Sequence, residues 1–211
     1  TWSWDGANDM KLNGYDGGSI GAKGNLTIGV TGTNTVTADA GQSAIAVKNG
    51  NLAITGDGTL NATAQTDVIA AEGDGNAGGD VTISGANVNV TASGAVNSAA
   101  GIRATAGSVT IDKGADVKIE AKSAEGSWRP TVGTYGIFAD NLPSRHAAQE
   151  SEQEEPDYVS VHGGDVTIDA ANLSIKTADA WQVSVCINTV GIKKNTLMKI
   201  VNGADVALSA G

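Results

Sequence analysis

Cysteine, proline and aromatic residues are scarce in this chain. Its 211 residues include one cysteine, three prolines, one phenylalanine, three tyrosines and four tryptophans. The single cysteine, Cys186, excludes an intrachain disulfide. So few aromatic side chains argue against an ordinary globular core, because large rings usually supply much of its volume. They fit a narrow interior filled by smaller aliphatic residues.

Basic residues are outnumbered by acidic ones, and long apolar segments are absent. The chain has 13 Lys and Arg against 23 Asp and Glu, a formal net charge of −10. That charge disfavours nucleic acid and anionic membrane surfaces as partners. No stretch is long and apolar enough to span a bilayer, so we expect no membrane insertion. The acidic balance would permit a cation, and Ca²⁺ suits carboxylate and carbonyl oxygens.

The chain is rich in glycine and carries a repeated strand pattern. A Leu/Val-x-Ile triplet recurs at 26–28, 52–54, 81–83, 109–111 and 166–168, with a degenerate copy at 198–200. The first residues of successive copies are 26, 29, 28, 57 and 32 positions apart. A second short strand follows each copy, and a third precedes most of them. A period of this length indicates stacked repeats.

Three short alternating strands per period, with no helical pattern, predict an all-β right-handed parallel β-helix of about six to seven coils. Residues 1–23 are expected to form an N-terminal cap or an incomplete first coil, and 24–211 the β-helix. Segment 122–163 breaks the pattern and is expected to be an inserted loop. The 57-residue spacing has two explanations, a missing copy or an insertion about one repeat long.

Aromatic and arginine residues gather around the inserted segment. Phe138 occupies the outward slot that follows Arg103 in the preceding coil, so these two side chains are expected to be able to stack. Rings pack on the C–H faces of sugars, and guanidinium groups and carboxylates bind their hydroxyls. The candidate glycan-binding residues are therefore Arg103, Trp128, Arg129, Tyr135, Phe138 and Tyr158. The alternative is that the rings only pin the insertion to the rod.

One turn and the two ends of the chain suggest further roles. The turn 72–80 is rich in Gly and Asp, and Asp74, Asn76 and Asp80 are candidate Ca²⁺ ligands, although the same residue types are ordinary turn formers. Trp2 and Trp4 are expected to cover the first rung, with ligand binding as the alternative. The final strand, 206–208, has no cap, so we expect this rung to stack on further repeats or on another copy.

Several segments carry a resemblance to a known group of proteins. The stretches Trp2-Ser3-Trp4-Asp5-Gly6, Leu12-Asn13-Gly14-Tyr15 and Gly24-Asn25-Leu26-Thr27-Ile28 resemble repeats in large surface proteins of gut Firmicutes and related bacteria. Segment 51–60 resembles the same family and the wider group of β-helical "carbohydrate-binding domain-containing" proteins, which are pectate-lyase-like β-helices. The resemblance covers nearly the whole chain outside 122–163. It implies a secreted or bacterial cell-surface location and, for some members, binding of pectic or cellulosic polymers with Ca²⁺.

Motifs for catalysis are missing. The chain has no serine-nucleophile elbow, phosphate loop, zinc-type Cys/His spacing or dinucleotide fingerprint. The repeat register places no Asp cluster on one face beside a basic residue. We therefore expect a non-enzymatic adhesion or glycan-binding module, with a polysaccharide or another host or bacterial glycan as its partner. The alternatives are a structural spacer of a larger surface protein and, less favoured, a polysaccharide lyase or hydrolase.

Overall fold

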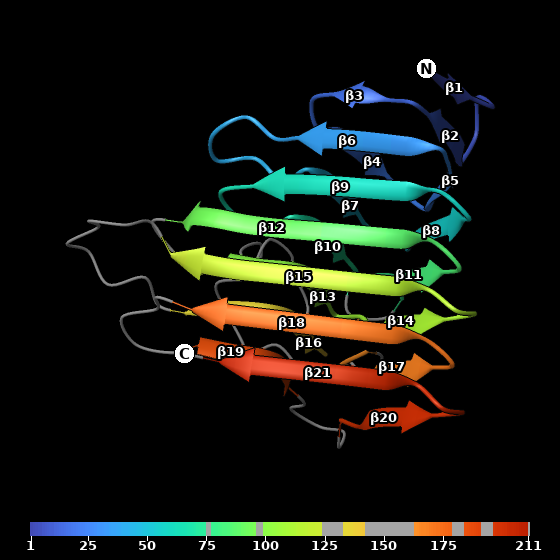
Figure 1. The fold of residues 1–211 in the computed structure, drawn as a ribbon. Coiled ribbons are helices and arrows are strands. Elements are labelled where there is room, and N and C mark those ends of the chain that lie inside the picture. Colours follow the sequence, from blue (N-terminus) through green and yellow to red (C-terminus); the bar gives the residue numbers. More distant parts are fainter. Residues whose placement is uncertain are drawn as a thin grey trace, which may run out of the picture.

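A computed structural model of the chain describes residues 1–74, 77–95, 99–123, 133–141, 163–178, 184–190 and 196–210. These residues form strands that wind into a rod (Figure 1). Coil by coil, the strands are β1 (Trp2–Trp4); β2 (Asp9–Asn13), β3 (Asp16–Gly17), β4 (Ile20–Lys23); β5 (Leu26–Thr31), β6 (Thr33–Thr37), β7 (Ile45–Lys48); β8 (Leu52–Gly56), β9 (Thr59–Ala64), β10 (Ile69–Glu72); β11 (Val81–Ser84), β12 (Asn87–Ala95), β13 (Ala99–Thr105); β14 (Val109–Asp112), β15 (Asp116–Ser123), β16 (Thr134–Asp140); β17 (Val166–Asp169), β18 (Asn172–Ala178), β19 (Ser184–Val190); and β20 (Met198–Val201), β21 (Asp205–Ala210).

The strands form three sheets, one on each face of the rod. Sheet A has the order β1-β2-β5-β8-β11-β14-β17-β20, sheet B runs from β3 to β21, and sheet C runs from β4 to β19. Strands from successive coils pair in parallel; among the strands of the described residues, only β1 pairs antiparallel, with β2. The predicted right-handed parallel β-helix, with three strands per coil and six to seven coils, is confirmed (Figure 1).

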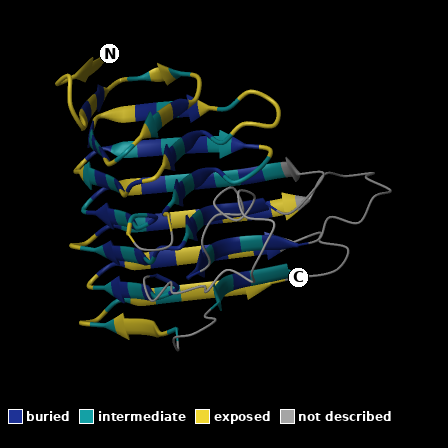
Figure 2. Cartoon of the chain, turned by 180° about the vertical axis from the view of Figure 1, so that it is seen from behind, coloured by how far each residue is buried: buried dark blue, intermediate teal, exposed yellow. Residues whose placement is uncertain are grey.

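Aliphatic side chains stack in columns inside the rod. Leu26, Leu52, Val81, Val109 and Val166 are Cα partners from coil to coil. Each of them is at most 2% exposed. A single coil could not bury these side chains, whereas each buried one contributes about 1.5 to 3 kcal/mol once coils lie above and below it. Figure 2 shows buried residues along the middle of the rod and exposed ones at both ends.

The long spacing in the repeat is an insertion and not a missing rung. Val109 of β14 is the direct Cα partner of Val166 of β17, although 57 positions separate them. Strand β16 lies inside segment 122–163 and takes its place in sheet C between β13 and β19. Residues 124–132 and 142–162 of that segment lie outside the described residues.

The first coil is built from residues 9–23. Strands β2, β3 and β4 supply one strand to each sheet, and β1 adds an antiparallel edge to sheet A. Because β3 has only two residues, a buried side chain completes the pairing here. The Tyr15 amide donates to Asn34 Oδ1 at 2.9 Å, and Asn34 Nδ2 donates to the Thr31 carbonyl at 2.9 Å. Asn34 is fully buried, and it ties the first coil to the second.

Candidate functional site

The outer face of sheet C changes character along the rod. One outward position per coil forms a row of Cα partners, which are Gly21, Ala46, Ala70, Arg103, Phe138 and Asn188. The first three residues of the row are small, and the last three are large and polar or aromatic. This row therefore carries only small side chains over β4, β7 and β10, and larger polar or aromatic side chains over β13, β16 and β19.

Arg103 lies between a carboxylate and an aromatic ring. Its guanidinium carbon is 4.6 Å from the centroid of the Phe138 ring, and its Nε donates to Asp67 Oδ2 at 2.5 Å. The other oxygen of Asp67 accepts a hydrogen bond from the Ala100 amide at 2.8 Å. The side chains of Arg103 and Asp67 are 22% and 23% exposed, so solvent still reaches both groups. The backbone of one coil thus fixes the carboxylate that positions the arginine.

Tyr135 completes the group. Its ring meets that of Phe138 edge to face, with centroids 5.0 Å apart and an interplanar angle of 76°. Residues three apart on a regular strand point to opposite faces. Here Gly136 and Ile137 are both buried, which interrupts the alternation and leaves the two half-buried rings on the same side. We call Asp67, Arg103, Tyr135 and Phe138 the sheet C cluster.

The predicted stacking of Arg103 on Phe138 is present, and Tyr135 lies with them. The other candidates, Trp128, Arg129 and Tyr158, lie outside the described residues. Sequence reasoning missed Asp67, because it lies in a connecting segment and belongs to no repeated triplet. The signal that could have found it is the register, since Ile69 and Ile102 are partners and Asp67 therefore lies level with Ala100.

The two described candidates for Ca²⁺ binding hold backbone amides. Asp74 Oδ1 accepts from the Ala77 amide at 2.9 Å, and Asp80 Oδ1 accepts from the Ser108 amide at 2.8 Å. Asn76 lies outside the described residues. In the described part of the chain, no three His, Cys, Asp or Glu side chains come close enough together to hold a metal ion. A Ca²⁺ site in this turn stays a prediction.

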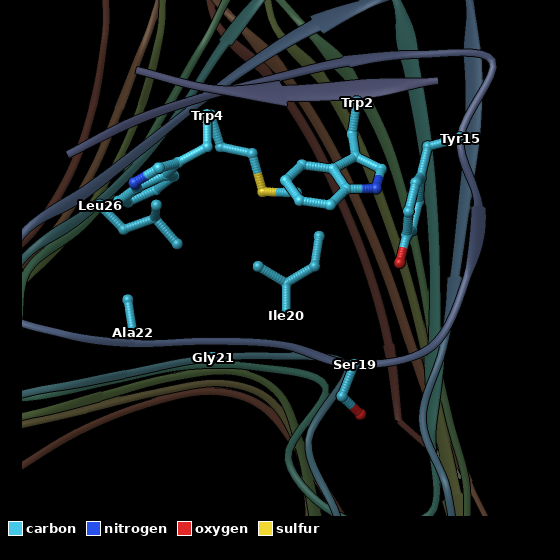
Figure 3. A pocket seen from close by; sticks show the side chains of 9 residues that line it. Trp2, Trp4, Tyr15, Ser19, Ile20, Gly21, Ala22 and Leu26 are labelled. Carbon is cyan, nitrogen blue, oxygen red and sulfur yellow. The ribbon is translucent and has the colours of Figure 1, made fainter. Parts of the chain in front are cut away.

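An apolar recess opens at the N-terminal end of the rod, and we call it the N-terminal mouth. It has a volume of about 420 Å³, and its lining includes Trp2, Trp4, Tyr15, Ile20 and Leu26. Figure 3 shows the two indole rings on one side and Ile20 with Ala22 of β4 on the other. Trp2 is 60% and Trp4 43% exposed, so the rings line the recess without closing it.

The turn between β1 and β2 depends on one carboxylate. The Ala7 and Asp9 amides donate to Asp5 Oδ1 at 2.8 and 3.1 Å. These hydrogen bonds favour the charged form and hold the pKa of Asp5 below its ordinary value, the bond from Ala7 contributing most. The ionised carboxylate therefore helps to keep Trp2 and Trp4 over the mouth.

No protein-family model, curated protein or solved structure matches this chain. Among the described residues, no helix has the length and apolar character needed to cross a membrane. The sheet C cluster and the N-terminal mouth must therefore be interpreted from their own chemistry.

Proposed function

We propose that this protein is a non-enzymatic glycan-binding or adhesion module, secreted or displayed at a bacterial cell surface, and that its sheet C cluster contacts polysaccharide. The observation that carries the proposal is the Arg103 guanidinium, which is held between the Asp67 carboxylate and the Phe138 ring on an outward sheet face. It supplies hydrogen-bond donors beside half-buried aromatic rings, the combination that a sugar ring requires.

Each group of the cluster has a role in this proposal. The exposed parts of the Phe138 and Tyr135 rings would pack on sugar C–H groups. The terminal NH₂ groups of Arg103 would donate to hydroxyls, and the neighbouring Asn188 in the outward row would add an amide donor and acceptor. Because the ion pair and ring stacking already hold Arg103, its side chain loses less conformational freedom on binding.

The charge of the cluster favours a neutral polysaccharide over an acidic one. The positive charge of Arg103 is largely compensated by Asp67, its ion-pair partner. The net charge of the whole chain, −10, repels polyanions at long range. We therefore expect neutral glucans or xylans to bind with little dependence on salt, and polygalacturonate to bind more weakly.

The proposal is tested by retention on insoluble and immobilised polysaccharides. Phe138→Leu keeps an apolar side chain but removes the ring, and Arg103→Gln removes the charge. Each change is expected to weaken binding roughly 5- to 10-fold, equivalent to about 1 kcal/mol or slightly more. The matched control is Asn89→Ala on sheet B, which removes a surface hydrogen bond to Asn61. Wild-type retention by folded Phe138→Leu and Arg103→Gln would refute the proposal.

A structural spacer is the second candidate function. The observation that favours it is the outer face of sheet A, where Thr82, Thr110 and Thr167 form a uniform ladder with no aromatic group. Such a ladder suits an exposed β surface and needs no ligand. A wild-type chain that binds no glycan of a broad panel would support the spacer over the glycan-binding module.

A further inference from the structure

The outward row of sheet C runs along the rod axis and not along any one strand. Its six members lie on the successive strands β4, β7, β10, β13, β16 and β19, one from each coil. Neighbouring strands of a sheet lie about 4.8 Å apart, so the five steps between the six residues span about 24 Å. That length corresponds to several sugar residues of an extended polysaccharide.

The functional groups of the sheet C cluster extend farther across the strands than along them. Arg103, Phe138 and Asn188 occupy the row on three successive coils. Along β16 the cluster gains one ring, that of Tyr135, but Asp140 on the other side of Phe138 is only 5% exposed. A bound chain therefore meets more of these groups when it crosses the strands than when it follows one of them.

The N-terminal half of the row leaves this path clear. Ala46 and Ala70 alternate with buried neighbours on β7 and β10, so each directs only a methyl group outward. A Cβ atom added at Gly21 would meet nothing within 4 Å. Beside the row, Lys48 and Glu72 are Cα partners that place polar side chains where hydroxyl groups of a chain over Ala46 and Ala70 would lie.

We infer that the glycan bound at the sheet C cluster lies along the rod axis, with about one sugar residue per coil, and that it is a β-1,4-linked chain. This inference rests on the proposed function. An extended β-1,4-linked chain of pyranose rings advances per residue by nearly the spacing between coils, so successive sugars meet successive coils in the same way. Chains with β-1,3 or α-1,4 linkages coil or curve, and they lose this register after one or two residues.

The first test compares soluble oligosaccharides by calorimetric titration of the 211-residue chain. Cellohexaose, laminarihexaose and maltohexaose have the same number of glucose residues but β-1,4, β-1,3 and α-1,4 linkages. We expect cellohexaose to bind roughly 10-fold more tightly than either of the other hexaoses. Cellotriose covers only the coils of Arg103, Phe138 and Asn188, so we expect it to bind several-fold more weakly than cellohexaose.

The second test places an obstacle on the row outside the cluster. Ala46→Leu adds a branched side chain two coils from Arg103, where a hexaose reaches and a triose does not. We expect this change to weaken cellohexaose binding roughly 3- to 5-fold and to leave cellotriose binding unchanged. Ala53→Leu makes the same substitution at a half-buried outward position of sheet A and is the matched control. Circular dichroism and thermal unfolding establish that both variants are folded.

The outcomes separate this inference from the proposed function. Equal binding of the three hexaoses would overturn the β-1,4 specificity, and unchanged cellohexaose binding by Ala46→Leu would overturn the axial path. In either case glycan binding by the cluster stands if Phe138→Leu still weakens it. If none of the oligosaccharides binds, the inference is overturned together with the proposed function.

Discussion

Gly136 is the position where one added methyl group tests the stacked interior most sharply. A Cβ atom placed there would lie 2.2 Å from Ile175 Cγ2 and 2.5 Å from the Cys186 carbonyl oxygen. Gly136 has no left-handed φ, so any effect of an alanine comes from these contacts and not from backbone strain. One of these contacts is with the backbone of β19, the neighbouring strand in sheet C, which cannot move aside as a side chain can. We therefore expect Gly136→Ala to lower the free energy of unfolding by about 2 to 3 kcal/mol.

The matched control is Gly21→Ala in the same sheet, where an added Cβ atom would meet nothing within 4 Å. We expect that change to be neutral or slightly stabilising, since alanine reduces the freedom of the unfolded chain. Thermal unfolding followed by circular dichroism should place Tm of Gly136→Ala about 4 to 12 °C below that of the control. In a double-mutant cycle, Gly136→Ala should cost less in an Ile175→Ala background than in the wild type, because the side-chain contact with Ile175 Cγ2 is then absent. Equal Tm values for Gly136→Ala and Gly21→Ala would refute the close rung-on-rung packing.

Two further predictions concern the first coil. Asn34→Ala removes the acceptor for the Tyr15 amide and the donor to the Thr31 carbonyl, so we expect a loss of about 2 to 3 kcal/mol and faster hydrogen exchange at Tyr15; unchanged exchange there would contradict this role. The folded-state pKa of Asp5 lies below its ordinary value, so its contribution to the β1–β2 turn is present above that value and is lost as the pH falls through the lowered pKa. Exchange of the Ala7 amide should accelerate over that acid range in the wild type but not in Asp5→Asn, and an identical pH profile in both proteins would argue against this coupling.

Much of the fold could be predicted because the repeat pattern fixes it. The recurring Leu/Val-x-Ile triplets at 26–28, 52–54 and 81–83 place one apolar pair per coil, and only stacking can bury them. The same register placed Phe138 next to Arg103, which is why this contact was predictable. The 57-residue spacing fits an insertion and a missing copy equally well, so only the pairing of Val109 with Val166 separates them.

The rest of the site depended on features that break the repeat. Asp67 precedes β10 and belongs to no triplet, and its role follows from the geometry of one connecting segment. Tyr135 shares a face with Phe138 because Gly136 and Ile137 are both buried, an irregularity that simple alternation does not predict. The N-terminal mouth follows from the antiparallel pairing of β1, which the parallel pattern of the later coils does not indicate.

In the proposed function, stacked coils bring residues that are distant in sequence together into one glycan-binding face on sheet C. The most direct measurement is an NMR titration of the isotope-labelled protein with a soluble neutral oligosaccharide. We expect the amide signals of Arg103 and Phe138 and of their neighbours on β13 and β16 to shift, and those of Asn61 and Asn89 on sheet B to stay unchanged. Shifts confined to sheet B, or no shifts with any oligosaccharide from a polysaccharide that retains the protein, would contradict it.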